Sequence, residues 1–273
     1  MITDLHRQLA ALNRGRWVPG NRAPTDFDAA SLADLVEGVE AANTEGVHFA
    51  REDRLRDLYT DGAALARTFG EAMADMPEKP ERGLAPLVGT SPEQVVWVDL
   101  ETTGLHGRPL FLVGIMTWED GDLVVRQYFA RDYSEERAVL WAAREALGRA
   151  RVVVTFNGRS FDLPYLRDRM TYHRLPMAQD FADVDLLHPC RRRWRRRLPN
   201  CRLQTLETYL CRRRRVGDIP GFLIPQRYHE YVHSKDPKLV GPIFHHNRLD
   251  LVAMAELLVA LLAPPDQGEE EDA

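Results

Sequence analysis

Cysteine is scarce in this sequence, and neither a long apolar run nor a closely spaced cysteine pair is present. Cys190, Cys201 and Cys211 lie eleven and ten positions apart, which is too sparse for a disulfide framework, so we expect a reducing compartment. The missing Cys-x₂-Cys pair argues against a structural zinc site. No apolar run approaches the roughly 18 residues of a membrane-spanning helix, and charged residues interrupt the N-terminal segment where a signal peptide needs an apolar core. The sequence therefore predicts a cytoplasmic protein with no membrane partner.

Charge is balanced over the whole chain but not locally. The formal net charge is −5, yet residues 186–215 hold eleven arginines against one acid, Glu207, which gives this segment a charge of +10 before histidines. The opposite extreme is 269–272, four consecutive acids. A concentrated basic segment in an acidic protein is typical of a localised polyanion site, and nucleic acid is the expected partner. The acidic stretch leaves a second possibility open, namely that it neutralises the arginines within the same chain.

The chain divides by pattern into three parts. Residues 1–90 show helical spacing of apolar side chains, as at Leu65, Phe69 and Met73, followed by a proline-rich stretch, so they predict a helical N-terminal extension and linker. The remaining parts are a domain over 91–264, which includes a basic insert at 188–216, and an acidic tail at 265–273.

Short β-rich runs alternate with helical segments after residue 94. The expected strands are residues 95–100, 110–117, 123–130, 151–156 and 183–187, with helices at 134–148 and 160–172. This order predicts an α/β fold in which a mixed five-stranded sheet is flanked by helices.

The first of these strands is expected to present two carboxylates on one face. Side chains alternate along a strand, so Asp99 and Glu101 share a side while their apolar neighbours point the other way. Carboxylates that are buried together are costly to leave ionised, and a hard cation such as Mg²⁺ or Mn²⁺ removes that cost. The alternative is an ordinary polar strand end, with Thr102 and Thr103 as turn residues.

Two further acids stand at the starts of expected helices. Asp162 follows the strand at 151–156, and Pro164 suits a first helical turn. Asp250 is expected in the first turn of a C-terminal helix, just after His245 and His246. Acids are also common at helix starts because they favour the helix dipole, so a purely structural role is the alternative for both.

These segments resemble the DEDD exonuclease superfamily, which has a ribonuclease-H-like fold. The resemblance rests on Asp-Leu-Glu-Thr-Thr-Gly at 99–104, on Asn157 with Asp162, and on a histidine shortly before Asp250. It covers roughly residues 94–262, and the segments at 201–207, 218–221 and 246–250 look most like the YprB-like branch. The resemblance implies a metal-dependent nuclease with Asp99, Glu101, Asp162 and Asp250 as ligands of two Mg²⁺ or Mn²⁺ ions.

The residues support that chemistry directly. Two metal ions activate the attacking water and stabilise the leaving oxygen of a phosphodiester, and a nearby histidine can act as the base. His245 has the five-residue offset of histidine-type relatives, whereas His246 stands directly before Asn247, where the branch usually carries its His or Tyr. We favour His246, and both remain candidates.

The expected substrate is nucleic acid, either DNA or RNA, bound as a single strand. Thr102, Thr103 and Asn157 are candidate substrate contacts beside the acids, and the arginines expected to grip the phosphate backbone are Arg192, Arg193 and Arg196. Trp194 either stacks on a base or packs in the core. The predicted activity is 3′→5′ exonuclease action on single-stranded ends. The rival hypothesis is a catalytically silent nucleic-acid-binding or scaffold protein that keeps the same fold.

Overall fold

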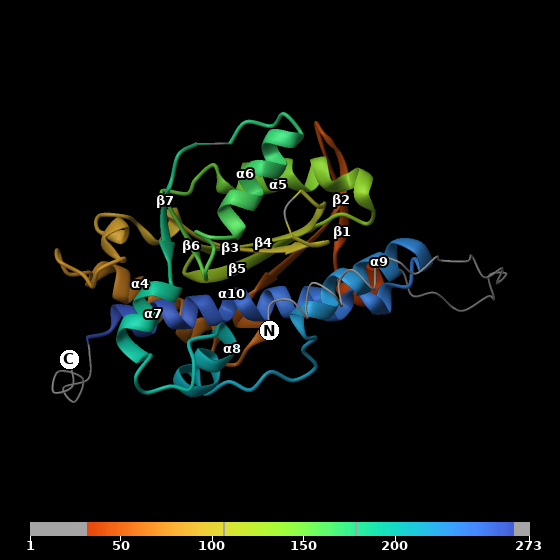
Figure 1. Cartoon of the computed structure of the whole chain (residues 1–273). Helices are drawn as coiled ribbons and strands as arrows, with labels where there is room; N and C mark the ends of the chain where they lie inside the picture. Colours follow the sequence, from red (N-terminus) through yellow and green to blue (C-terminus); the bar gives the residue numbers. More distant parts are fainter. Residues whose placement is uncertain (1–31, 106, 178, 265–273) are drawn as a thin grey trace, which may run out of the picture.

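A mixed seven-stranded sheet with helices on both faces organises the computed structural model, which describes residues 32–105, 107–177 and 179–264 (Figure 1). The strand order is β1-β2-β5-β4-β3-β6-β7. The strands are β1 (Val39–Asn43), β2 (Gly46–Arg54), β3 (Val95–Thr102), β4 (Leu110–Glu119), β5 (Asp122–Phe129), β6 (Val152–Thr155) and β7 (Ala182–Asp185). The helices are α2 (Leu32–Val36), α3 (Leu55–Leu58), α4 (Gly62–Ala74), α5 (Glu136–Leu147), α6 (Asp162–Tyr172), α7 (Leu187–Trp194), α8 (Leu203–Leu206), the π-helical turn η4 (Glu207–Cys211), α9 (Ile224–Ser234) and α10 (Gly241–Leu262).

The centre of the sheet follows the sequence closely. The turn between β4 and β5 places Asp120 and Gly121 at positive φ, the conformation that a tight hairpin needs. β3 pairs antiparallel with β4 and parallel with β6, and β6 pairs parallel with β7. The carboxyl ends of β3, β6 and β7 therefore point the same way, and the loops that follow them gather at one edge of the sheet.

The sheet is larger than the five strands that the sequence predicted, because β1 and β2 extend it. β2 pairs antiparallel with β5, and β1 forms the outer edge. The wholly helical extension predicted for 1–90 is therefore wrong over 39–54, although α2, α3 and α4 are helical as expected. β1 is mostly exposed, so it lacks the alternating apolar residues by which a strand is recognised. The domain boundaries stay predictions, and the acidic tail at 265–273 lies outside the described residues.

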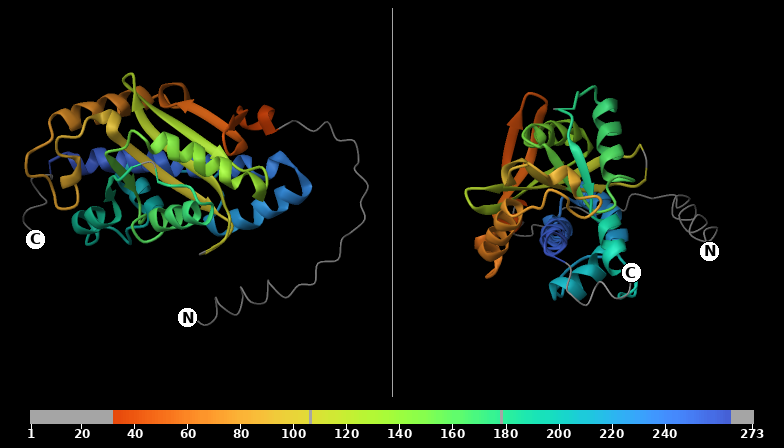
Figure 2. Two further views of the ribbon diagram at one scale, coloured as in Figure 1. Left: turned by 90° about the horizontal axis from the view of Figure 1, so that it is seen from above. Right: turned by 90° about the vertical axis from the view of Figure 1, so that its left-hand side faces the viewer.

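Two apolar cores lie on opposite faces of the sheet. α5 and α6 cover one face, whereas α4, α7 and α10 lie along the other (Figures 1 and 2). Val98 and Leu100 belong to the cluster that contains buried residues of α5 and α6, while Val95 and Trp97 belong to the cluster that contains Leu251 of α10. By alternation, Asp99 and Glu101 share the α10 side of β3.

The long helix α10 carries the last of the expected acids. It begins at Gly241, with Pro242 in its first turn, so Asp250 stands in the middle of the helix rather than in the first turn that the sequence predicted. The earlier start reflects apolar residues such as Ile243 and Phe244, which are buried and fix this part of the helix against the sheet. Among the described residues, no helix combines the length and the apolar character needed to cross a bilayer.

Candidate metal and nucleic-acid site

Two side-chain amides, Asn247 of α10 and Gln127 of β5, form a hydrogen-bonded chain that holds Asp99 of β3 in place. The side-chain amide of Asn247 donates to Oδ2 of Asp99 at 2.7 Å and to its backbone oxygen at 3.2 Å. The amide of Gln127 in turn donates to Oδ1 of Asn247 at 2.8 Å. Both amides are fully buried. Gly114 stands opposite Asp99 on β4, and its missing side chain leaves the space that Asn247 fills.

Asp162 reaches the same edge from the other face of the sheet. It is the first residue of α6, and its carboxylate accepts hydrogen bonds from its own backbone N–H and from that of Leu100, between the two acids of β3. The loop before α6 is fixed by Asp185 at the end of β7, whose Oδ1 accepts from the backbone N–H of Asn157 at 2.7 Å. Asp185 therefore supports the loop that leads to Asp162.

The acids Asp99, Glu101, Asp162 and Asp250, here called the carboxylate cluster, influence one another strongly. Burial raises the pKa of Asp99 well above its usual range, and repulsion from the other three acids adds to the effect. Burial likewise raises the pKa of Glu101 to about 8, with the charge of His246 opposing the change. Burial raises the pKa of Asp162 to about 7 against the effect of its backbone hydrogen bonds. The cluster is thus a single electrostatic unit in which no arginine or lysine forms an ion pair with Asp99, Glu101 or Asp162 within the described residues, and His246 is the cation whose charge acts on Glu101.

Asp250 differs from the other three because it has a cationic partner. Oδ1 of Asp250 lies 2.6 Å from Nη2 of Arg215, and the same guanidinium contacts Glu207 at 2.5 Å and Asp218 at 3.2 Å. The Arg215 side chain is only 9% exposed. The Asp250 and Arg215 atoms are close but poorly aligned, so Oδ1 of Asp250 is buried without a hydrogen bond.

The two candidate histidines face different surroundings. Nδ1 of His246 bonds Oδ1 of Asp218 at 2.7 Å, and Nε2 lies 3.6 Å from Oδ2 of Asp250. Burial alone would lower the pKa of His246, but the hydrogen bond to Asp218 and the charges of Asp250 and Glu101 raise it to about 9. His245 instead donates from Nε2 to the backbone oxygen of Val216. His246 is therefore the histidine that faces the carboxylate cluster.

The cluster fits a divalent cation by its donor chemistry. Glu101 forms no hydrogen bond or ion pair within the described part of the chain, Asp250 keeps a buried oxygen without a hydrogen bond, and carboxylate oxygens are the ligands that Mg²⁺ and Mn²⁺ prefer. In residues 32–105, 107–177 and 179–264, however, no three His, Cys, Asp or Glu side chains converge at metal-binding geometry. The ion pair of Asp250 with Arg215 is one reason why the four acids do not converge, because it draws Asp250 toward a guanidinium.

The predicted substrate contacts beside the acids are engaged within the chain. The hydroxyl of Thr102 donates to the backbone oxygen of Gly104, and that of Thr103 donates to the backbone oxygen of Pro109. Asn157 adopts a positive φ of 64°, and its backbone is held by Asp185. These three residues lie next to the acids and shape the loops around them.

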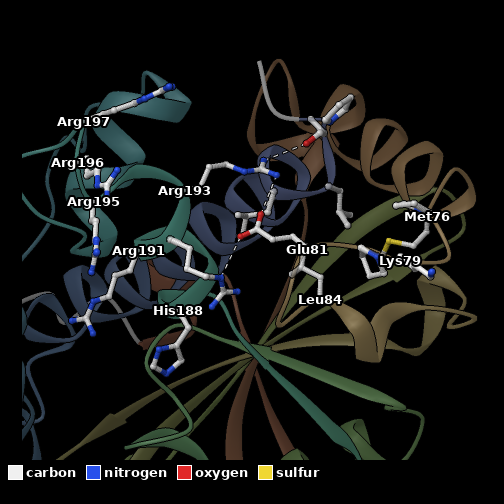
Figure 3. A pocket seen from close by; sticks show the side chains of 17 residues that line it. Met76, Lys79, Glu81, Leu84, His188, Arg191, Arg193, Arg195, Arg196 and Arg197 are labelled. Atoms are coloured by element: carbon white, nitrogen blue, oxygen red, sulfur yellow. Dashed lines mark hydrogen bonds and ion pairs between the residues drawn. The ribbon is translucent and has the colours of Figure 1, made fainter. Parts of the chain in front are cut away.

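Arginines of the basic insert line a separate groove of about 1330 Å³ (Figure 3). This arginine groove lies between α7, the segment before β3 and the end of α10, and none of the four acids lines it. The lining residues with charged or imidazole side chains are Lys79, Glu81, His188, Arg191, Arg192, Arg193, Arg195, Arg196 and Arg197. The three predicted backbone contacts, Arg192, Arg193 and Arg196, are therefore brought together, but apart from the carboxylate cluster.

Not all arginines of the insert are free to bind a substrate. Arg193 contacts Glu81 at 3.0 Å and donates to the backbone oxygen of Ala260 near the end of α10. Arg213 is paired with Glu256 and Asp61. Acids from other parts of the chain therefore supply some of the negative charge that the basic segment needs. Trp194 is buried in the core, so the packing alternative describes it.

Arg215 and Asp218 are the residues at this site that sequence reasoning did not single out as functional. Arg215 appeared only as one of a run of four arginines, and Asp218 only within a segment of the family resemblance. Both lie in a loop with no periodic pattern, so their approach to α10 depends on tertiary structure.

Comparisons with known proteins agree with this architecture. A family described as the RNase_H superfamily matches residues 96–262. A stretch of 176 residues is 30% identical to the uncharacterized protein YprB of Bacillus subtilis (strain 168), over 63% of this chain and 42% of YprB. The fold is similar to that of a family B DNA polymerase from the hyperthermophilic archaeon Pyrobaculum calidifontis, with a TM-score of 0.51 and 19% identity over 62% of this chain and 24% of the polymerase.

The chain thus spans less than half of YprB and about a quarter of the polymerase. The comparisons confirm the predicted α/β, ribonuclease-H-like fold and the resemblance to YprB. The matched residues run from β3, which carries Asp99, to the end of α10, which carries Asp250. With more than half of its length matched by the family, this chain belongs to the RNase H superfamily.

Proposed function

We propose that this protein is a divalent-metal-dependent nuclease that hydrolyses phosphodiester bonds at single-stranded 3′ ends. Membership of the RNase H superfamily indicates a nuclease in general terms. The observation that carries the finer proposal is the carboxylate cluster, in which β3, α6 and α10 each supply acids to one electrostatic unit beside His246. A purely structural set of acids would be expected to form ion pairs with basic side chains, and Glu101 forms no ion pair within the described residues although the charge of His246 lies near it.

The proposed ligands of two Mg²⁺ or Mn²⁺ ions are Asp99, Glu101, Asp162 and Asp250. Bound ions would supply an activated water and charge stabilisation for the leaving oxygen. The raised pKa values of Glu101 and Asp162 support this proposal, because they report carboxylates that favour the neutral form unless a cation is present. Asn247 contributes by fixing the orientation of Asp99 through its hydrogen bond to Oδ2.

The chain's own residues offer a route for the proton. Asp218 holds Nδ1 of His246, which leaves Nε2 directed toward Asp250 and available to exchange a proton with a water at the carboxylate cluster. In contrast, His245 uses Nε2 to hold the loop at Val216. This division of contacts supports His246 rather than His245 as the base, because bound cations would offset the negative charges that raise its pKa to about 9 and so favour its neutral form.

Surface features beside the site support a single-stranded substrate. Phe222 is 81% exposed, and a methyl group placed at the neighbouring Gly221 would lie 3.8 Å from Nε2 of His246. An exposed aromatic ring next to the reacting group can stack on an unpaired base, which duplex DNA does not present. Further from the acids, Arg191 and Arg195 are exposed in the arginine groove, where they would bind the phosphate backbone.

The test is digestion of end-labelled single-stranded DNA, single-stranded RNA and duplex, with Mg²⁺ or Mn²⁺ and with EDTA. We expect metal-dependent loss of a 3′ label before a 5′ label, and at least a hundredfold loss of rate in Asp99→Asn, the order typical of removing an electrostatic catalytic group. Asp168→Asn is the matched control, because Asp168 is an exposed acid of α6. Tight binding of nucleic acid with no cleavage under any metal would favour the silent binding protein instead.

A further inference from the structure

Arg215 stands out among the arginines because it is nearly buried and directed at a proposed metal ligand. Its guanidinium contacts Glu207, Asp218 and Asp250, at 2.5, 3.2 and 2.6 Å respectively. These acids are themselves between 2% and 18% exposed. One cation therefore serves three carboxylates in a place with little solvent, where charge interactions are stronger than at the surface.

The local backbone is shaped to deliver this side chain. Glu207 begins the π-helical turn η4, a rare conformation that is frequent at functional sites. Arg212 follows at a left-handed φ of 53° and ends the turn. Arg213 then fixes the loop to α10 by its ion pair with Glu256. The basic insert therefore contacts α10 at two points: Arg213 pairs with Glu256, and Arg215 pairs with Asp250.

We propose that Arg215 is a built-in counter-ion that competes with one of the two metal ions for Asp250. The inference rests on the proposed function, because it assumes that the carboxylate cluster binds metal. Oδ1 of Asp250 is held near Arg215 Nη2 without a well-aligned hydrogen bond. Because the contact lacks good hydrogen-bond geometry, an ion can take its place more easily than it could replace an optimal bidentate pair.

This arrangement makes the two proposed ion positions unequal. Asp99, Glu101 and Asp162 have no cationic side chain bonded to them within the described residues, so an ion on their side removes repulsion without displacing anything. An ion that uses Oδ1 of Asp250 must displace Arg215, which would then retain Glu207 and Asp218 as partners. The first ion is therefore tight and the second weak.

The experiment is a titration of the full chain with Mn²⁺. Binding is measured by calorimetry and by the electron paramagnetic resonance signal of the free Mn²⁺. We expect one tight ion in the wild type and a second that binds at least about tenfold more weakly, the effect of displacing a charged partner. Arg215→Gln should tighten the second ion about tenfold. Arg214→Gln is the control, since Arg214 is the exposed neighbour, and it should leave both affinities unchanged.

Two equally tight ions in the wild type would overturn the proposal, as would an unchanged second affinity in Arg215→Gln. If that variant does not fold, Arg215→Lys decides the question. Its amine keeps the charge but cannot span three carboxylates, so the second ion should again tighten, and an unchanged ratio would refute the competition. Absence of any Mn²⁺ binding in the wild type would instead contradict the proposed function, so the two failures are distinguishable.

Discussion

Gly114→Ala is expected to damage the carboxylate cluster without changing any charged residue. A methyl group at this position would lie 2.1 Å from Oδ1 of Asn247 and 2.7 Å from its Cγ. Ordinary carbon–oxygen contacts begin at about 3.3 Å. Asn247 is fully buried in α10, so its amide must move by about an ångström, or β4 and α10 must separate.

The magnitude follows from the bonds that this amide makes. Displacing Asn247 breaks one hydrogen bond to the Asp99 carboxylate, one to the Asp99 backbone oxygen and one from Gln127. A hydrogen bond to a charged group contributes about 1.5–3 kcal/mol, and a neutral one about 1 kcal/mol. Overpacking adds about 1–3 kcal/mol. Allowing for partial relaxation, we expect the free energy of unfolding to fall by about 3–6 kcal/mol, or roughly 6–24 °C in Tm.

Urea unfolding and Mn²⁺ titration of the same variant provide the assay. Gly70→Ala is the matched control, because a methyl group there meets Trp118 at no less than 3.4 Å and lies within α4. Alanine favours a helix over glycine, so this control should be neutral or slightly stabilising. If the free energy of unfolding of Gly114→Ala in urea lies within about 1 kcal/mol of the wild-type value, or if the variant keeps its Mn²⁺ affinity, the proposed role of Asn247 is wrong.

Three further predictions concern pH, salt and the support of α6. Burial raises the pKa of Glu101 from its ordinary value of 4.5 to about 8 and that of Asp162 from 3.8 to about 7. The metal-free folded state therefore binds more protons than the unfolded state, and it loses stability as pH rises from about 4 through 8. Thermal melts in EDTA should show a lower Tm at pH 8.5 than at pH 6, and Mn²⁺ should remove most of that decrease; a flat profile would contradict it. Replacing Arg191 and Arg195 by glutamine should reduce the salt dependence of single-strand binding by about 1.4 in log–log slope, whereas an unchanged slope would exclude the groove as a backbone contact. Asp185→Asn should lower the free energy of unfolding in urea by about 1–3 kcal/mol and weaken Mn²⁺ binding, because the backbone N–H groups of Asn157 and Arg159 before α6 lose a charged acceptor; equal stability would show that this acceptor is dispensable.

The central strands could be predicted because their physical signals are local. β3 is an apolar run with two acids at alternate positions, and the turn at Asp120 and Gly121 has the composition that positive φ requires. β1 gives no such signal. It is a mostly exposed edge strand, so its positions accept Glu and Ala as readily as Val, and no apolar alternation marks it in the sequence. Its place in the sheet depends on β2, and that of β2 on β5, far away in sequence.

The acids of the candidate site were predictable one by one, whereas their partners were not. Asp99 and Glu101 follow from strand alternation, and Asp162 from its position after a strand. Arg215 and Asp218 come from an irregular loop, where no periodicity predicts direction. Their ion pairs with α10 exist only once the chain is folded.

Anomalous diffraction from crystals grown with Mn²⁺ tests the central claim most directly. We expect an anomalous peak for Mn²⁺ bound by Asp99, Glu101 and Asp162, between the end of β3 and the start of α6, with any second and weaker peak at Asp250. Crystals that hold millimolar Mn²⁺ and show no anomalous peak beside Asp99 would contradict it.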